Sequence, residues 1–147
     1  MKKTPDHKER SHAILAPSGA SKWMACPPSA RLEETLPESN TIYSEEGTLA
    51  HEINDLTVNL ALGRVGKAKY KKDLAKLKLK KSSEGEDLYS EEMLDCAAEY
   101  ESIVMQQLTE ARLLAEDAVI YVERKFDLSQ YIPQSKGHLD ISIIADK

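Results

Sequence analysis

The sequence is poor in the residues that usually stabilise very small or secreted folds. Its two cysteines, Cys26 and Cys96, lie far apart and form no C-x-x-C pair, so neither a zinc finger nor a disulfide scaffold is predicted. Aromatic residues are scarce, with one Trp, one Phe and six Tyr, so the core must be built from Leu, Ile, Val and Ala. No apolar run approaches the roughly 18 residues of a membrane span.

What the sequence does contain is typical of a folded, charged domain. It has 147 residues, of which 41% are hydrophobic and 31% are charged, and this is the length of one ordinary domain. The charged first ten residues are followed by no apolar stretch, so we expect no signal peptide and a cytoplasmic location. The net charge of −5 argues against a protein that coats nucleic acid non-specifically, although it leaves room for an enzyme with a small basic groove.

The N-terminal part predicts a tail followed by short helices. Residues 1–12 are polar and basic, and we expect a flexible tail there, with the folded domain over residues 13–147. Helical structure is predicted over about residues 18–36, broken at Pro27 and Pro28. Ser18 is the expected N-cap of its first part, and Trp23 is the expected packing anchor.

A clearer helix is predicted over about residues 47–62. Its apolar residues fall at helical spacing on one stripe, namely Leu49, Ile53, Leu56 and Leu60. His51 lies about 200° round the helix from Leu49 and therefore points away from this stripe, on the same face as Asp55.

The segment that follows, residues 63–86, is rich in Lys. Residues 75–80 alternate apolar and basic side chains, as a strand does, but Lys is a poor strand former, so we expect a short edge segment or a mobile loop. The lysines form either a solvated face or a basic patch near a substrate path.

The longest helix is predicted over about residues 90–116. Ser90 is a good cap, and the apolar positions at near-heptad spacing are Met93, Ala97, Tyr100, Val104, Leu108 and Ala111. Cys96 lies beside this stripe and is expected to be a small buried hydrophobe.

Two strands are predicted next, over about residues 118–125 and 138–145, antiparallel and joined by a long hairpin. The predicted fold class is therefore α+β, with N-terminal helices followed by strands. An isolated two-stranded ribbon is only marginally stable. Either a partner chain pairs with the C-terminal strand, which would allow self-association, or the natural protein continues, and we expect the second.

Three residues could carry chemistry, and each has a plain structural alternative. Asp140 is a carboxylate in mid-strand that either faces solvent or belongs to a site, and Gly137 before it permits close approach of backbone or ligand. His51 lies among acidic residues that suit a divalent cation but that also suit a helix N-terminus. Glu123 follows an apolar strand and is either a ligand or an exposed strand end paired with a neighbouring basic residue.

Four segments together resemble a phage and prophage family of RecB-like nucleases with the PD-(D/E)XK fold, classed as domain of unknown function family 2800. Residues 15–33 resemble its opening, and residues 45–52 contain its G-T-x-x-H helix. Residues 89–100 resemble its long helix, and Val122-Glu123 with Gly137 to Asp140 resemble its V-E and G-x-x-D strand pair. The resemblance covers most of residues 12–146, as the N-terminal part of the nuclease domain.

The resemblance implies metal-dependent hydrolysis of DNA phosphodiester bonds during phage replication or recombination. Asp140 would be a catalytic metal ligand, His51 a second ligand and Glu123 a third candidate, around Mg²⁺ or Mn²⁺. The implied partners are DNA, as ends or single strands, and phage replication or recombination proteins. The candidate residues for DNA contact are Lys71, Lys72, Lys78, Lys80 and Lys81.

The sequence also departs from the pattern of these nucleases. No D/E-x-K motif follows Asp140, and the downstream Gln-bearing helix is absent, so the 147-residue chain is expected to be inactive and the intact protein longer. Some relatives bind an iron–sulfur cluster, but three of its four cysteines are missing here, so no cluster is predicted and Cys26 is expected to be a packed thiol. The rival functions are a nuclease-derived module that binds DNA or protein without cutting, and a helical protein that dimerises through its exposed strand edge.

Overall fold

The structure is a computed structural model, and it describes residues 14–33, 35–36, 41–132 and 135–145. The chain divides into two compact units, one formed by residues 1–38 and 123–141 and the other by residues 39–122 and 142–147. A β-hairpin contributes residues to both units. The tail predicted for residues 1–12 lies outside the described residues.

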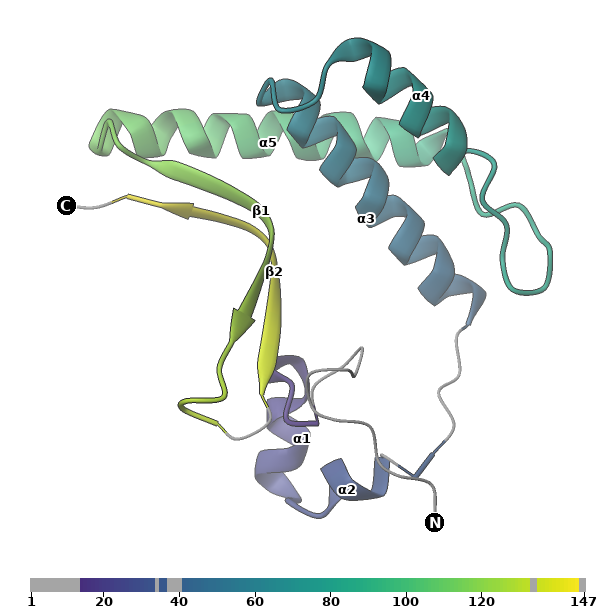
Figure 1. The fold of residues 1–147 in the computed structure, drawn as a ribbon, viewed down its shortest axis with the longest axis vertical. Helices are drawn as coiled ribbons and strands as arrows, with labels where there is room; N and C mark the ends of the chain where they lie inside the picture. The colour runs from purple at the N-terminus through teal and green to yellow at the C-terminus, as the bar shows by residue number, and fades with distance from the viewer. Residues whose placement is uncertain (1–13, 34, 37–40, 133–134, 146–147) are drawn as a thin grey trace. The chain divides into compact units, whose positions relative to one another are not determined.

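The larger unit is built on three helices, α3 (Ile42–Ala61), α4 (Lys67–Leu77) and α5 (Glu92–Leu114). Helix α3 packs against both of the others, and Figure 1 shows it crossing α5. The buried core of this unit contains Leu49, Ile53, Leu88 and Ala97. Partly buried side chains pack against this core, among them Leu74, Leu77, Tyr89 and Met93. The apolar stripes predicted for α3 and α5 therefore do form the contact surface of these helices, as helical spacing dictates.

The helix boundaries show where the sequence was misread. α3 begins at Ile42, five residues before the predicted start, because Thr41 caps it and accepts a hydrogen bond from Ser44 N at 3.3 Å. Gly47 lies inside this helix rather than at its beginning. The first residue of α5 is Glu92, and no side-chain cap is formed there, so Ser90 is not its cap.

The prediction for residues 75–80 was wrong, because Ala75 and Leu77 belong to helix α4 and not to an edge strand or loop. Its apolar residues Tyr70, Leu74 and Leu77 recur at helical spacing and are partly buried, whereas Leu79, beyond the helix, is 79% exposed. After α4 the chain makes a short antiparallel bridge between Lys81 and Asp87.

The smaller unit holds a 3₁₀ turn, η2 (Pro17–Gly19), and two short helices, α1 (Ala20–Ala25) and α2 (Ser29–Glu33). The helices are shorter than predicted, and Ser18 lies inside the 3₁₀ turn, where it caps neither element. Trp23 is half-buried and its indole N–H donates to the carbonyl of Ala16 at 3.0 Å, which supports its predicted role as an anchor.

Both cysteine predictions were wrong, since Cys26 and Cys96 are exposed. Cys96 lies one position before the buried Ala97, and this single step round α5 takes its side chain off the packed stripe. Cys26 follows the last residue of α1, where the chain leaves the helix, and its side chain is exposed.

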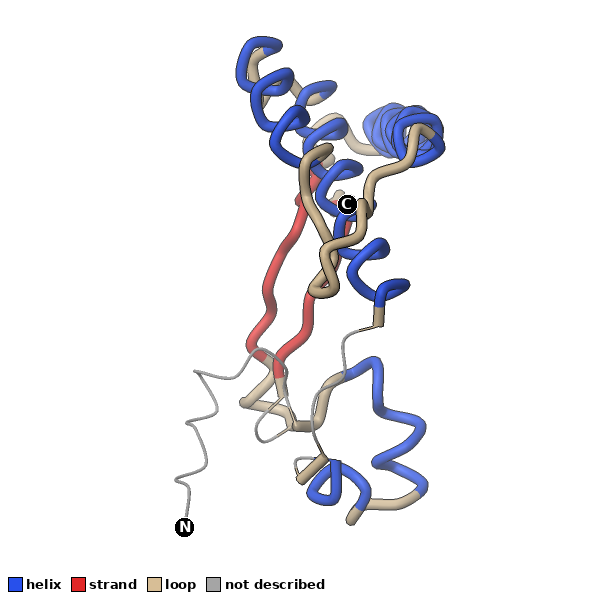
Figure 2. The backbone as a smooth tube through the Cα atoms, turned by 90° about the vertical axis from the view of Figure 1, so that its right-hand side faces the viewer, coloured by secondary structure: helices blue, strands red, loops and turns tan. Residues whose placement is uncertain are grey.

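The hairpin consists of β1 (Val119–Asp127) and β2 (Lys136–Ile144), which are antiparallel, as predicted. Figures 1 and 2 show the two strands running side by side over their full length. With helices and one antiparallel sheet, the fold class is α+β, which confirms that prediction. None of the helices within the described residues has the length and hydropathy needed to cross a membrane.

Candidate metal centre and basic surface

The hairpin brings two of the predicted site residues together. Glu123 on β1 and Asp140 on β2 each offer a carboxylate oxygen, and these oxygens lie within 4.8 Å of each other. Both side chains are exposed. Two like charges at this distance repel by about 1 kcal/mol in water, so a bound cation between them would remove an unfavourable interaction.

Glu123 also has an unusual backbone. Its φ of 53° is the one positive φ among the described residues other than glycine, and such a conformation costs on the order of 1–3 kcal/mol in a residue with a side chain. The strand continues past it to Asp127, so Glu123 is not a strand end as its simpler interpretation required. A strained acidic residue in mid-strand favours a functional role, because strain of this kind concentrates at binding and catalytic sites.

Asp140 is positioned by the segment just before it on β2. Gly137 lies against Pro17, and a Cβ at this position would lie 3.4 Å from the proline ring, an ordinary van der Waals contact. Ser135 is fully buried, and its hydroxyl donates to the carbonyl of Leu15 at 2.7 Å. These two contacts fix the start of β2, and Asp140 follows three residues after Gly137.

His51 belongs to the other unit, where it lies on α3. Its side chain is exposed, whereas Leu49 and Ile53 on either side of it in the sequence are buried, which confirms that it points away from the apolar stripe. Nearby on the same helix, Glu52 makes an ion pair with Lys80, and Glu45 accepts a hydrogen bond from the backbone of Ser83 at 3.0 Å. Two of the acidic side chains near His51, those of Glu45 and Glu52, therefore stabilise the loop after α4.

The five candidate DNA-contacting lysines fall into two groups. Three of them make ion pairs: Lys78 with Glu91 at 3.5 Å, Lys80 with Glu52, and Lys81 with Asp87 at 3.1 Å. Lys78 also lies 4.4 Å from the centre of the Tyr89 ring, and the Tyr89 hydroxyl, followed by the charge of Glu91, raises the pKa of Lys78 above its usual value. These lysines are therefore engaged in holding the loop structure.

Lys71 and Lys72 form the second group and lie exposed on α4. Lys67 and Lys69 on the same helix are also exposed, and none of these four makes an ion pair with any residue that the structure describes. Lys67 and Lys69 were not among the predicted DNA-contacting residues, because the sequence pattern of residues 75–80 hid the helix. At about 100° per residue, Lys72 falls on the side opposite the apolar stripe, Lys69 and Lys71 flank the stripe on its two sides, and Lys67 lies nearer to it.

A family model described as "Protein of unknown function (DUF2800)" matches residues 12–147, so the chain belongs to this family. No solved structure matches the chain. Membership of the family is thereby confirmed, and its kinship with RecB-like nucleases stays a prediction.

Proposed function

We propose that the intact protein is a metal-dependent nuclease that hydrolyses DNA phosphodiester bonds, as the resemblance to RecB-like nucleases implies. The observation that carries the proposal is the pair formed by Glu123 and Asp140, whose carboxylate oxygens lie within 4.8 Å of each other on neighbouring strands. Carboxylates are the ligands that Mg²⁺ and Mn²⁺ prefer in proteins. The strained backbone of Glu123 supports a role for this pair beyond surface charge.

In this proposal His51 supplies an imidazole as a further ligand, a role that comes from the G-T-x-x-H motif alone. One imidazole with two carboxylates suits Mn²⁺ better than Mg²⁺, because imidazole is a softer ligand than oxygen. A bound ion would polarise the phosphodiester, lower the pKa of an attacking water and stabilise the leaving oxygen. Replacing His51 by Ala should therefore weaken Mn²⁺ binding more than Mg²⁺ binding.

The residues of this chain would each have a limited task. Asp140 and Glu123 would hold the charge-neutralising ion against the phosphate, and Lys71 and Lys72 would contact the DNA backbone. The acid and the lysine of the D/E-x-K motif, which the resemblance places on a following strand, would complete the site of the intact protein.

The direct test is DNA cleavage by the intact protein with Mg²⁺ or Mn²⁺, using single-stranded and duplex substrates with free ends. The proposal predicts that cleavage depends on the metal and is abolished in Asp140→Ala, while Asp117→Ala, an exposed acid after α5, cleaves normally. Undiminished cleavage in Asp140→Ala would remove this residue from the site.

A second candidate function is a module that binds DNA without cutting it. Four exposed lysines of α4 favour it, because they offer positive charge on a protein of net charge −5 and make no ion pair within the described part of the chain, namely Lys67, Lys69, Lys71 and Lys72. DNA binding that persists in metal chelator, together with no cleavage by the intact protein under any divalent metal, would support this candidate over the nuclease.

A further inference from the structure

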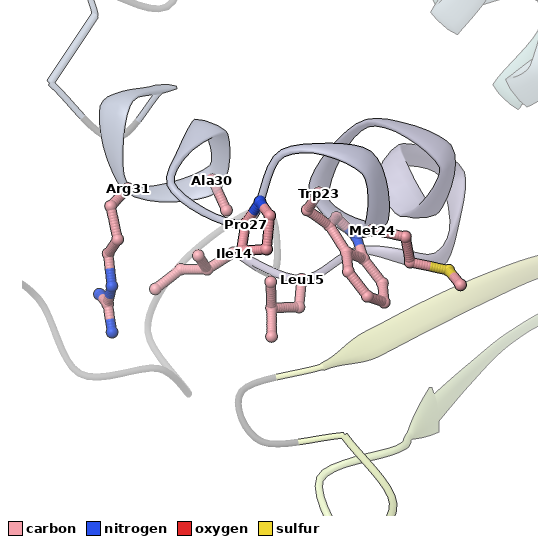
Figure 3. Close-up of a pocket in the computed structure, with 7 residues that line it drawn as sticks. All are labelled: Ile14, Leu15, Trp23, Met24, Pro27, Ala30 and Arg31. Carbon is pink, nitrogen blue, oxygen red and sulfur yellow. The ribbon is translucent and has the colours of Figure 1, made fainter.

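The smaller unit contains a pocket that the proposed metal centre does not use. Its volume is about 420 Å³, within the range of small-ligand sites, and it is lined by Ile14, Leu15, Trp23, Met24, Pro27, Ala30 and Arg31. Figure 3 shows Arg31 at one end and Trp23 with Met24 at the other, with the apolar residues between them. The pocket therefore fits a ligand with a flat apolar part and an anionic group.

The aromatic end of this pocket is held in place. Trp23 donates its indole N–H to the carbonyl of Ala16 at 3.0 Å, and its ring lies 3.6 Å from the position where a Cβ on Gly19 would be. A ring that is fixed in this way loses little conformational freedom when a ligand stacks on it. Stacking on an aromatic side chain is a recurring way in which proteins bind an unpaired base.

Polar side chains also line this region. Arg31 lines the pocket, and a guanidinium group presents a planar set of donors that matches a phosphate. A smaller pocket of about 170 Å³ shares Ile14, Trp23 and Ala30 with the first and is lined in addition by Ser29. The Ser29 hydroxyl is buried and has no hydrogen-bond partner among the described residues. A buried hydroxyl without a hydrogen bond is unfavourable, and a bound ligand would supply the missing hydrogen-bond partner.

The pocket is joined to the strand that carries Asp140. Leu15, one of its lining residues, accepts the hydrogen bond from Ser135, and Pro17 packs on Gly137. Asp140 follows Gly137 by three residues, a distance of about 10 Å along a strand. A single nucleic-acid strand could therefore place one phosphate at the carboxylate pair and insert into this pocket a base that lies a few nucleotides further along the same strand.

We propose that this pocket binds one unpaired base of a single-stranded nucleic acid, with the base stacked on Trp23 and its phosphate on Arg31. The choice of nucleic acid over other aromatic anions rests on the proposed function, because the carboxylate pair on the same unit would act on a phosphodiester. Binding at the pocket needs no metal, so this proposal and the nuclease proposal can fail separately.

The test uses the intrinsic fluorescence of the 147-residue protein. Trp23 is the one tryptophan of the sequence, so any change in tryptophan emission reports on this pocket. The protein is titrated with a short oligothymidylate in the presence of a metal chelator, and binding is followed in parallel by the anisotropy of a labelled oligonucleotide. We expect saturable quenching of Trp23 with the same midpoint as the anisotropy change.

Variants then locate the contact. Trp23→Ala should weaken oligonucleotide binding by about 5- to 150-fold, the loss expected for one base–aromatic stack. Arg31→Gln keeps the fluorescent reporter and should weaken binding by about tenfold, the loss of a charge-assisted hydrogen bond. The matched control is Arg112→Gln, an exposed arginine near the end of α5, which removes the same charge and should have little effect.

Since Trp23→Ala could unfold this unit, Met24→Ala provides a second variant at the same end of the pocket. Met24 is 70% exposed, so its removal should leave the fold intact and weaken binding, while Leu32→Ala on α2, which is 64% exposed and outside the pocket, should not. Oligonucleotide binding without any change in Trp23 emission would overturn the proposal. A response of Trp23 to an apolar peptide but not to the oligonucleotide would also overturn it and assign the pocket to a protein partner.

Discussion

The hydroxyl of Ser135 donates a 2.7 Å hydrogen bond to the carbonyl of Leu15, a residue 120 positions earlier in the chain. Ser135 is fully buried, and it stands directly before β2, the strand that carries Asp140. The positions of Leu15, which lines the pocket, and of Asp140, which belongs to the carboxylate pair, therefore both depend on this hydrogen bond. Its removal should disturb the smaller unit as a whole.

Replacement of Ser135 by Ala should lower the free energy of unfolding by about 1–3 kcal/mol, because the Leu15 carbonyl would lose its partner in a buried place. The measurement is urea-induced unfolding, followed by Trp23 fluorescence for the smaller unit and by circular dichroism for the helices. Ser102→Ala on the exposed side of α5 is the control and should change stability by less than about 0.5 kcal/mol. Equal effects of the two substitutions would show that the Ser135 contact contributes little.

The positive φ of Glu123 predicts a conflict between stability and function. Glycine adopts a φ of 53° without strain, so Glu123→Gly should stabilise the protein by about 1 kcal/mol, or roughly 3–5 °C in Tm, and should also weaken metal binding.

The control for this substitution is Lys125→Gly, two residues further along the same strand. Since φ is positive only at Glu123 among the described residues that are not glycine, Lys125→Gly gains no relief of strain. It should therefore lower the Tm, because glycine weakens a strand. A lower Tm in Glu123→Gly as well would contradict the assignment of strain.

The lysines of α4 predict how DNA binding depends on salt. Each phosphate contact that is lost should reduce the slope of log K against log salt concentration by about 0.7–0.9. The double variant Lys71→Ala and Lys72→Ala should thus lower the slope by about 1.5, while Lys81→Ala, whose lysine is paired with Asp87, should leave it nearly unchanged. A slope that falls only in Lys81→Ala would move the DNA contact from α4 to the loop.

Lys78 predicts a loss of stability at high pH. Its pKa in the folded protein is raised above the usual value of 10.5, first by the Tyr89 hydroxyl and then by Glu91. A group whose pKa is raised by folding stabilises the protein below its unfolded pKa, and this contribution is lost as the pH rises through the folded pKa. The Tm of the wild type should therefore fall more between about pH 10 and pH 12 than the Tm of Lys78→Gln. Lys69→Gln is the control and should follow the wild type.

Part of the fold could be predicted because single helices and strands leave a periodic signal. The stripes of α3 and α5 and the alternation of β2 were sufficient to place these elements. Helix α4 was missed because residues 75–80 alternate, and this short strand-like pattern hid the helical spacing of Tyr70, Leu74 and Leu77. The good helix propensity of its many lysines was the signal that could have found it.

The candidate site could be predicted only in part, because its geometry depends on strand pairing and backbone conformation, which leave no periodic signal in the sequence. Glu123 and Asp140 were both named, but their proximity depends on the register of the hairpin, and register follows from the loop between the strands rather than from the strands themselves. The backbone conformation of Glu123 leaves no trace in the sequence, since positive φ is rare for glutamate. The exposure of Cys26 and Cys96 depends on which helix faces are covered, which composition cannot show.

The central claim, that Glu123 and Asp140 form a cation site, is tested most directly by Mn²⁺ binding to the 147-residue protein, measured by calorimetry and by electron paramagnetic resonance. The account predicts one saturable site, weakened at least about tenfold in both Asp140→Asn and Glu123→Gln and unchanged in Asp117→Asn. Absence of saturable binding, or equal binding in all four proteins, would contradict it.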